Sequence, residues 1–516
     1  MSSVTNHPST RAPAGRGSHA RREAPLQMDP DEFRRAGHAL VDSIAAFLGS
    51  VRERPVTTGE SPGEIRNALD AAAPLPHTGT DAAALLDDAS RLLFEHSLLN
   101  GSPRFFGYIT SSPAPLGILA ELLAAAVNPN VGAWRLSPMA TEIEAQTIRW
   151  IAELVGYPTS CGGLLVSGGN MANMVGLFAA RAAGAGWDVR ARGVAAPDAR
   201  TLRVYASKET HTWLQKGADL AGLGTDAVRW IATDDDLRMD VAELRAAIER
   251  DRAADELPMM VVGTAGSVST GAVDPLTEIA ELCRREKIWF HVDGAYGAFA
   301  AALPDAPAEL RALALADSVA MDPHKWLYSP LEAGCVLVRD AEQLRKAFAY
   351  HPPYYHFGQE ATNYVDLGPQ NSRGFRALKV WLALRQVGRE GYVRMISDDI
   401  DLTRKLHTAV SGHPELEPYT LALSISTFRY VPLDLRDRLG EERTESYLDT
   451  LNQELLERIQ LSGEAFVSNA VIRGRYLLRA CIVNFNTTIA DVEALPEIVA
   501  RMGRATDAEL RPGAAV

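Results

Sequence analysis

The sequence reads Met-Asp-Pro-His-Lys-Trp-Leu at residues 321–327, and this stretch is the starting point for the fold. A short, partly apolar segment precedes it, and the Asp-Pro pair is typical of a turn. We therefore expect Lys325 on a loop just after a buried strand, where α/β sheets bind ligands. A lysine between His324 and Trp326 is poorly solvated, which favours the neutral amine that attacks carbonyl groups. The alternative is an ordinary surface lysine, so the other loops must decide between the two.

The composition is that of a soluble protein with a large core. The chain has 516 residues, of which 47% are apolar and 23% charged, and its net charge is −13. The negative charge argues against nucleic-acid binding. Four widely spaced cysteines without a Cys-x-x-Cys pair indicate neither a metal site nor a disulfide framework, so a reducing cytoplasm is the simplest location. No apolar run approaches the roughly 20 residues that span a bilayer, so we expect no membrane partner.

The N-terminal part divides into two predicted segments. Residues 1–27 contain arginine, serine, proline and glycine with almost no acidic residue, which indicates a disordered tail. A transit peptide is the alternative, but the prolines and glycines break any amphipathic helix. Residues 28–114 are expected to be helical, and the first helix has an apolar stripe with little of its own to pack against. We therefore expect this segment to dock on another surface, such as a second subunit.

The rest of the chain predicts a large and a small domain. Residues 115–394 alternate helices with short apolar strands, the pattern of a mostly parallel α/β sheet, with a helix expected at 376–387. Residues 395–505 are expected to form a smaller α+β domain, and residues 506–516 a frayed end. The expected elements of the small domain are helices at 398–410, 444–460 and 489–502 and strands at 421–430 and 477–483.

A glycine-rich turn follows another predicted strand. Residues 164–166 are apolar, and Ser-Gly-Gly-Asn-Met-Ala-Asn follows at 167–173 before a helix. Glycines at such a turn expose backbone amides at the positive end of a helix, which suits a phosphate group. The stretch lacks a Walker lysine and a full Gly-x-Gly-x-x-Gly pattern, so a tight turn without a ligand is an equally good interpretation.

Three more strand ends carry candidate residues. His211 follows one of them, and its flat ring could stack on a planar cofactor, although a lone histidine is more often structural. A loop rich in glycine and hydroxyl groups at 263–271 contains Thr264 and could equally be an ordinary turn. Asp293 ends a mostly apolar strand, where a charge is costly to bury without a partner. We therefore expect a cation beside Asp293.

Two aromatic stretches lie on either side of this region. Residues 102–108 read Ser-Pro-Arg-Phe-Phe-Gly-Tyr, a pattern that occurs more often in a core than at a cofactor. Residues 350–364 form a long irregular stretch of aromatic residues and histidines. Loops of this length inside a compact domain are often functional lids.

Together these features match what pyridoxal phosphate (PLP) requires of a protein. The cofactor needs a lysine for a Schiff base, an acidic partner for its pyridinium nitrogen, a stacking surface and a phosphate cup. Lys325, Asp293, His211 and the glycine turn supply one of each. The alternative, an unrelated turn aspartate and a salt-bridge lysine, explains fewer of the features.

The chain also resembles the group II PLP-dependent decarboxylases, the family of aromatic-L-amino-acid decarboxylase and glutamate decarboxylase. The resemblance extends over residues 28–500, and the pair HVDGAYG and DPHKWL is its most specific part. The motifs are SPRFFGY (102–108), SPMATEIE (137–144), SGGNMANM (167–174), THTWLQKGADLAGLG (210–224), HVDGAYG (291–297), DPHKWL (322–327) and SRGFRALKVW (372–381). It implies a fold-type-I (aspartate aminotransferase-like) PLP enzyme and a homodimer with its active site at the interface.

The resemblance implies roles for individual residues. Around the cofactor ring it implies Lys325 as the Schiff-base lysine, Asp293 as the pyridinium partner, Ala295 beneath the ring and His211 stacked on it. The remaining cofactor residues would be Gly169, Asn170, Met171, Thr264 and His324, with the amides of Asn170 and Met171 and the side chain of His324 at the phosphate. The substrate would lie near Tyr108, Asn100 and Trp134.

Three positions depart from the pattern of the aromatic-amino-acid enzymes. Asp322 stands where those enzymes have asparagine, which places a negative charge near the phosphate site. Asn100 replaces a tryptophan of the animal enzymes, and Gly132 replaces a bulky pocket residue. The role of residue 322 and the choice of substrate therefore do not follow from the resemblance.

The function implied is α-decarboxylation of an L-amino acid, with aromatic substrates expected first. The substrate amine would displace Lys325 from the cofactor, CO₂ would leave, and a proton would return to Cα. By its distance from Phe375, Tyr364 falls where these decarboxylases have a lid tyrosine that could act as the acid. The alternatives are an aldehyde synthase of the same family, a decarboxylase of acidic, aliphatic or diamino acids, and a PLP-binding protein without turnover.

Overall fold

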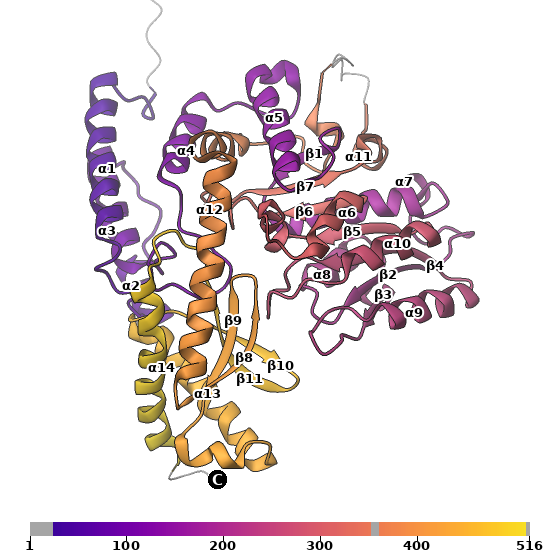
Figure 1. The fold of residues 1–516 in the computed structure, drawn as a ribbon. Coiled ribbons are helices and arrows are strands. Elements are labelled where there is room, and N and C mark those ends of the chain that lie inside the picture. Colours follow the sequence, from indigo (N-terminus) through magenta and orange to yellow (C-terminus); the bar gives the residue numbers. More distant parts are fainter. Residues whose placement is uncertain (1–23, 352–360, 512–516) are drawn as a thin grey trace, which may run out of the picture. The chain divides into compact units, whose positions relative to one another are not determined.

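The computed structural model describes residues 24–351 and 361–511 (Figure 1). The predicted tail up to residue 23 and residues 352–360 of the predicted lid therefore lie outside the described part. The chain separates into two compact units. One unit contains the described residues up to Gly49 together with Ala72–Glu95, and the other contains Ser50–Ala71 and the chain from His96 onward.

The first unit is helical, as the sequence predicts. Its helices are α1 (Pro30–Ser50) and α3 (Ala82–His96), and the last residue of each helix belongs to the other unit. Asp29 accepts a hydrogen bond from the Asp31 amide before Pro30 begins the helix. The rings of Phe47 and Phe94 stack with their centroids 4.3 Å apart. No residue of α1 is fully buried in the described single chain, and Phe33 and Val41 of its apolar stripe are exposed.

The second unit is built on a seven-stranded sheet with the order β1-β7-β6-β5-β4-β2-β3. Strand β7 pairs antiparallel with both of its neighbours, and the other pairings are parallel. The strands are β1 (Gly162–Val166), β2 (Leu202–Ser207), β3 (Val228–Ile231), β4 (Leu257–Thr264), β5 (Trp289–Asp293), β6 (Ser318–Met321) and β7 (Gly334–Val338). This arrangement confirms the predicted α/β class with a mostly parallel sheet.

Helices surround this sheet, so its central strands are buried along their length (Figure 1). Helix α10 is typical, because Leu276, Ile279 and Cys283 recur at helical spacing and are buried. The helical elements of this part are α2 (Pro62–Ala68), α4 (Pro115–Val127), η1 (Trp134–Leu136), α5 (Pro138–Leu154), α6 (Gly169–Gly184), α7 (Val189–Arg192), α8 (Trp213–Leu220), η2 (Thr225–Ala227), α9 (Val241–Ala253), α10 (Leu276–Glu286), η3 (Gly297–Ala302), η4 (Ala308–Leu315), α11 (Ala341–Phe348) and η5 (Tyr364–Asp366).

The C-terminal part contains a four-stranded antiparallel sheet with the order β10-β11-β9-β8. The single strand predicted at 421–430 is wrong, because the chain reverses there at Leu423, which has a left-handed φ of 49°. Helix α14 continues past residue 505, where the small domain was expected to end. The elements are β8 (Leu416–Ala422), β9 (Ile425–Tyr430), η6 (Leu433–Arg438), α13 (Glu442–Ser462), β10 (Ser468–Ile472), β11 (Arg475–Cys481) and α14 (Ile489–Leu510).

One long helix, α12 (Ala377–Gly412), replaces the two helices predicted at 376–387 and 398–410. Only Gly388 has a non-helical backbone, with φ 66°, so the helix is kinked there and resumes at once. It packs against α4, α5, α14, β8 and β9 and crosses the boundary expected at residue 394. The predicted large and small domains thus lie within one compact unit. None of the helices in the described ranges is long and apolar enough to cross a membrane.

Candidate active site

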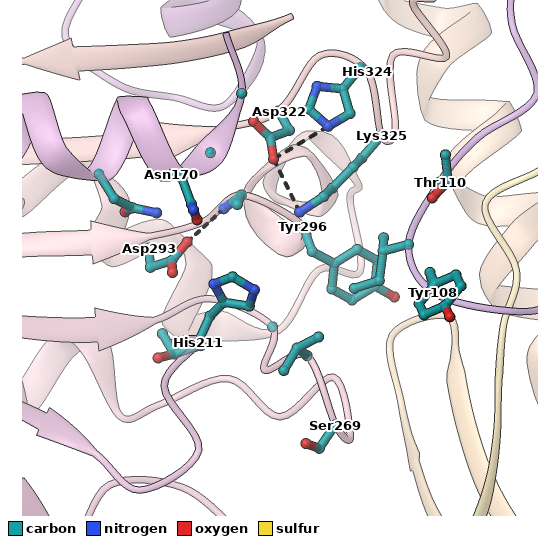
Figure 2. A pocket seen from close by; sticks show the side chains of 18 of the residues that line it. Tyr108, Thr110, Asn170, His211, Ser269, Asp293, Tyr296, Asp322, His324 and Lys325 are labelled. Atoms are coloured by element: carbon teal, nitrogen blue, oxygen red, sulfur yellow. Dashed lines mark hydrogen bonds and ion pairs between the residues drawn. The ribbon is translucent and has the colours of Figure 1, made fainter. Parts of the chain in front are cut away.

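A cavity of about 630 Å³ opens at the carboxyl ends of the central strands (Figure 2). This is the edge of a parallel sheet where ligands usually bind, because the loops after several strands meet there. The lining includes most of the residues predicted from the sequence: Tyr108, Gly169, Asn170, His211, Thr264, Asp293, Ala295, His324 and Lys325. The structure therefore brings together side chains that are far apart along the chain.

Asp293, the last residue of β5, is buried, with 6% of its surface exposed. The indole N–H of Trp213 donates to Oδ2 at 2.7 Å, and the amide of Ala295 donates to Oδ1 at 3.2 Å. Neither donor carries a full charge. Because a buried carboxylate needs more compensation than two neutral donors provide, this geometry favours a cationic group in the cavity.

Lys325 lies opposite and forms an ion pair with Asp322 in the cavity (Figure 2). The distance from Nζ to Asp322 Oδ2 is 3.1 Å, and Nε2 of His324 lies 3.7 Å from the same oxygen. Asp322 is only 2% exposed, and its Oδ1 has no hydrogen-bond partner within residues 24–351 and 361–511. The residue that departs from the family pattern thus holds the lysine nitrogen directly.

The glycine turn after β1 leads into α6 as predicted. Gly168 caps the helix with φ +111°, which an L side chain rarely adopts, and no side chain caps the first turn. A Cβ on Gly169 would lie 2.7 Å from Asp322 Oδ2, so glycine is required there for space. The free N–H groups and the helix dipole at this end form a cradle for an anion.

His211 lines the cavity beside Asp293 (Figure 2). Its Nδ1 accepts a hydrogen bond from the Trp213 amide at 3.2 Å, which fixes the ring. Partial burial lowers the pKa of His211, and the nearby Lys325 lowers it further, whereas Asp293 raises it. The ring is therefore neutral near pH 7 and suited to stacking on a flat ligand.

Four predicted site residues lie outside the cavity lining in the single chain: Met171, Asn100, Trp134 and Tyr364. The carbonyl of Asn100 accepts a long hydrogen bond from Asn484, and the indole of Trp134 donates to Glu142. The roles assigned to these residues stay predictions.

Tyr364 is buried away from the cavity. The guanidinium of Arg373 lies 4.6 Å from the centre of its ring, and burial raises the pKa of the Tyr364 hydroxyl well above its usual value. The position of this tyrosine within one chain gives no support to its predicted role as a lid acid.

Two residues that contribute to the site were missed in the sequence. Trp213 lies within a quoted motif, but nothing in its neighbourhood indicates that it binds Asp293. Arg479 lines the cavity, is 2% exposed, and donates through Nη1 to Tyr108 O at 3.1 Å and Ser468 Oγ at 3.0 Å. Its Nε and Nη2 have no hydrogen-bond partner among the described residues. The sequence does contain one signal for Arg479, because a charged residue between Leu478 and Ala480 in a buried strand needs a partner.

The family model for the pyridoxal-dependent decarboxylase conserved domain matches residues 62–423. The chain belongs to the pyridoxal-dependent decarboxylases. This decarboxylase is 32% identical over 472 residues to the aromatic-L-amino-acid decarboxylase of Bacillus atrophaeus, covering 90% of this chain and 94% of the relative. It is 30% identical to the phenylacetaldehyde synthase of Arabidopsis thaliana, covering 88% of this chain and 92% of that relative.

Solved structures of related enzymes have the same fold. The crystal structure of Oryza sativa TDC with PLP and tryptamine matches this decarboxylase with a TM-score of 0.86 at 28% identity. The match covers 94% of this chain and 99% of the chain in that structure. The predicted fold type and cofactor are confirmed, and the enzyme is a PLP-dependent amino-acid decarboxylase.

The cavity fits pyridoxal phosphate on its own geometry. The uncapped start of α6 suits the phosphate, the buried Asp293 suits a protonated ring nitrogen, and Lys325 Nζ lies in the same cavity. Asp322 adds a negative charge beside the phosphate cradle, and the ion pair with Lys325 offsets it.

Proposed function

We propose that this decarboxylase removes the α-carboxyl group of an aromatic L-amino acid and releases the amine. The observation that carries the proposal is the joint presence of Lys325, Asp293 and the glycine turn in one cavity. The aromatic substrate class is supported by the names of the relatives, among them the Bacillus enzyme, and by the wall of the cavity. Tyr108, Ile109, Val268 and Leu331 give this wall an apolar and aromatic part.

Six residues of the cavity have a proposed role in binding the cofactor. Lys325 would hold it covalently, Asp293 would keep its ring nitrogen protonated, and His211 would stack on the ring. Gly169 and Asn170 would bind the phosphate through backbone amides, with His324 nearby. Bound PLP supplies the sink for the electron pair that remains when CO₂ leaves.

Arg479 is our candidate for orienting the substrate carboxylate. It is a buried cation, and two of its N–H-bearing nitrogens have no partner in the described part of the chain. An anion is the ligand that such a group binds best. Its third nitrogen holds the carbonyl of Tyr108, whose half-exposed ring (56%) lies at the cavity. The same arginine would therefore orient the carboxylate and position an aromatic wall.

The proton that returns to Cα needs a donor in the cavity. We infer that Lys325 Nζ, held by Asp322 at 3.1 Å, is in position to deliver it after the substrate amine has displaced the lysine. Tyr364 stays an alternative donor, although its ring packs under Arg373 in the single chain.

A second candidate function is aldehyde synthesis, in which decarboxylation is coupled to oxidative deamination. It is favoured by the 30% identity to the Arabidopsis phenylacetaldehyde synthase. The two functions differ in whether the substrate Cα is protonated after CO₂ has left or reacts with O₂ first. Decarboxylation of acidic, aliphatic or diamino acids is a further alternative that the substrate test covers.

We also propose that the enzyme is a cytoplasmic homodimer with its active site at the interface. Helix α4 exposes the side chains of Leu119, Leu122, Leu123 and Val127 in the single chain. Four neighbouring apolar side chains on one helix form an exposed patch of the kind that marks a protein–protein interface. The four free cysteines agree with a reducing compartment.

The test of the substrate class is a panel of L-amino acids incubated with purified enzyme and PLP. Tryptophan, tyrosine and phenylalanine represent the aromatic class, and glutamate, lysine and leucine represent the alternatives. CO₂ and amine should form from at least one aromatic substrate with a kcat/KM far above the others. Turnover of glutamate or lysine alone would refute the substrate class while leaving the reaction type intact.

A further inference from the structure

A buried aspartate lies behind the loop that contains Lys325. Asp399 belongs to α12, and only 2% of its surface is exposed. Its Oδ2 accepts a hydrogen bond from the hydroxyl of Tyr328 at 2.7 Å and from the indole of Trp326 at 3.0 Å. One carboxylate oxygen thus binds the side chains one and three positions after Lys325.

A second residue of α12 binds the same loop. The hydroxyl of Tyr392 donates to the carbonyl of Leu327 at 3.2 Å. Tyr392 and Asp399 are two helical turns apart and therefore lie on the same face of α12. As a result, Trp326, Leu327 and Tyr328 are all hydrogen-bonded to this one helix.

The backbone of the loop needs such support. Tyr328 has a left-handed φ of 51°, which a bulky residue adopts only when its surroundings hold it. The ring of Trp326 stacks on Tyr296 with centroids 4.6 Å apart, and Tyr296 lines the cavity. The contacts of Asp399 therefore lie one residue layer behind the cavity.

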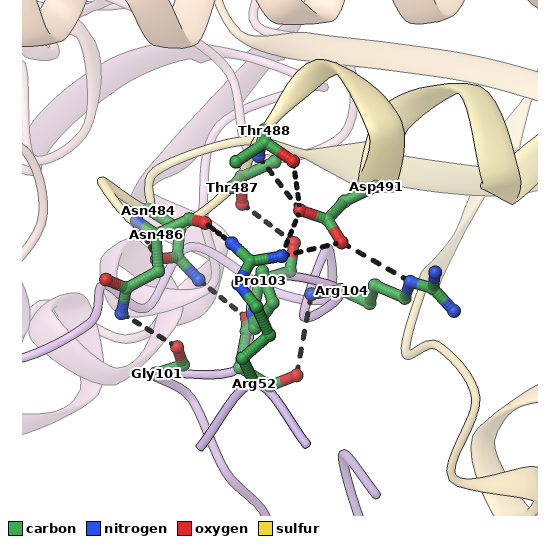
Figure 3. A network of polar contacts seen from close by, with 10 residues as sticks. Arg52, Gly101, Pro103, Arg104, Asn484, Asn486, Thr487, Thr488 and Asp491 are labelled. Carbon is green, nitrogen blue, oxygen red and sulfur yellow. Dashed lines mark hydrogen bonds and ion pairs between the residues drawn. The ribbon is translucent and has the colours of Figure 1, made fainter. Parts of the chain in front are cut away.

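Asp399 also binds the segment that supports the opposite wall. Its Oδ1 accepts a long hydrogen bond of 3.4 Å from the Asn484 amide, and Asn484 Nδ2 donates to the carbonyl of Ser102 at 2.7 Å. Figure 3 shows how Asn484, Asn486 and Thr487 hold the carbonyls at 101–103, in the segment that leads to Tyr108. Asp399 thus connects the loop of Lys325 with the support of the aromatic wall.

No salt bridge of the described residues includes Asp399. Burial raises the pKa of Asp399 to about 7, while the hydrogen bonds from Tyr328, Trp326 and Asn484 lower it and the charge of Asp398 raises it. The other titratable groups that interact with Asp399 are Tyr328, whose hydroxyl donates to it, and Cys481. Asp399 is thus a buried acid that is not needed for charge balance, and its contacts are with the Lys325 loop and its surroundings.

We propose that Asp399 is a positioning residue that fixes the loop of Lys325 in the geometry needed for cofactor binding. This inference rests on the proposed role of Lys325. The prediction is that loss of the acceptor oxygen loosens residues 325–328 and weakens PLP binding, whereas loss of the charge alone does not.

The test compares Asp399→Leu, which removes the acceptor, with Asp399→Asn, which keeps one. Asp398, the exposed neighbour on the same helix, provides the matched controls Asp398→Leu and Asp398→Asn. Hydrogen–deuterium exchange of the full-length, cofactor-free protein is followed for peptides covering 322–331, and the Kd for PLP is measured by absorbance. Neither measurement requires decarboxylation, so a failed substrate assignment would not affect them.

We expect Asp399→Leu to accelerate exchange in 322–331 with little change elsewhere and to raise the Kd for PLP about tenfold, as loss of a hydrogen bond to a charged or buried acceptor does. Asp399→Asn should stay within about threefold of the wild type, on the same reasoning. If Asp399→Leu leaves both measurements equal to those of Asp398→Leu, or accelerates exchange uniformly over the chain, the proposal is wrong.

A milder variant keeps the proposal testable if Asp399→Leu does not fold. Tyr328→Phe removes the donor at 2.7 Å and leaves Asp399 in place, so it should shift local exchange and the Kd in the same direction. Unchanged exchange and Kd in Tyr328→Phe would also contradict the proposal.

The pH dependence provides a third readout. The folded pKa of Asp399, about 7, is above its unfolded value, near 4, so its contribution to stability is complete below pH 4 and is lost as the pH rises toward 7. Asp399→Asn should therefore show a smaller loss of stability between pH 5 and pH 8 than the wild type or Asp398→Asn. Equal losses in all three proteins would place the titration on another group.

Discussion

The indole N–H of Trp213 donates to Oδ2 of Asp293 at 2.7 Å, across 80 residues of sequence. This bond leaves the carboxylate facing the cavity in a fixed orientation. Trp213 lies at the start of α8, and Asp293 ends β5, so the bond also joins the two loops that carry His211 and Ala295.

The first prediction concerns this bond. Trp213→Phe should lower kcat by about tenfold, because a hydrogen bond to a charged group contributes about 1.5–3 kcal/mol. Trp381→Phe is a matched control, since that indole donates to Gln146 at the same 2.7 Å outside the cavity. Equal kcat values for the two variants would show that the indole N–H does not orient Asp293.

Replacement of Asp293 itself should have a larger effect. Asp293→Asn removes the charge but keeps the shape, and we expect kcat to fall by at least a hundredfold, equivalent to about 3 kcal/mol of transition-state stabilisation. Steady-state kinetics at saturating PLP provide the measurement. Near-normal turnover with PLP bound would assign the pyridinium partner to another group.

Arg479 provides a test of substrate orientation. Arg479→Lys keeps a positive charge but loses the fork of N–H groups, so KM should rise about tenfold with a smaller change in kcat. Arg475→Lys, on the same strand but paired with Glu445 at 3.3 Å, is the control. If the KM of Arg479→Lys equals that of the control, Arg479 does not bind the substrate carboxylate and only holds Tyr108 and Ser468.

How far the site can be predicted from sequence depends on how local each signal is. Asp293 ends one apolar strand, and Lys325 lies in the turn after another. Short apolar runs followed by turn residues therefore locate both in the sequence. Trp213, Arg479 and Asp399 act through contacts with distant residues, such as the bond from Arg479 to Tyr108 across 371 residues. Such pairs depend on tertiary packing, and no periodicity in the sequence encodes them.

The same reasoning explains the errors in the fold. The sequence predicts a helix that ends at residue 387 and a second helix that begins at residue 398. Gly388 only kinks α12, and buried residues recur in the next turn, so the helix continues. The reversal at Leu423 was missed because no glycine or proline marks it, and the residue adopts a left-handed φ that is rare for leucine.

A further prediction separates the two proposed sources of the returning proton. Tyr364 is buried under Arg373 and outside the cavity lining, so Tyr364→Phe should keep the wild-type ratio of amine to aldehyde. Product analysis by chromatography, together with a peroxide assay, provides the measurement. A shift toward aldehyde and H₂O₂ would instead support the lid role predicted from the sequence and would require Tyr364 to reach a cofactor.

The attachment of the cofactor to Lys325 can be tested chemically. Borohydride reduction of the PLP-loaded enzyme should fix the label on the peptide that contains Lys325. Lys208 and Lys216 lie near the same loops but on exposed positions and provide the internal comparison. Recovery of the label on either of these lysines would exclude the assignment of Lys325.

The most direct test of the account is the stoichiometry of a single reaction mixture that contains the enzyme, PLP and an aromatic L-amino acid. CO₂, amine, aldehyde and O₂ uptake are measured together over the same interval. The account predicts one amine for each CO₂, with no O₂ consumed beyond the enzyme-free blank. O₂ uptake in step with CO₂ release, with aldehyde in place of amine, would contradict it and identify the enzyme as an aldehyde synthase.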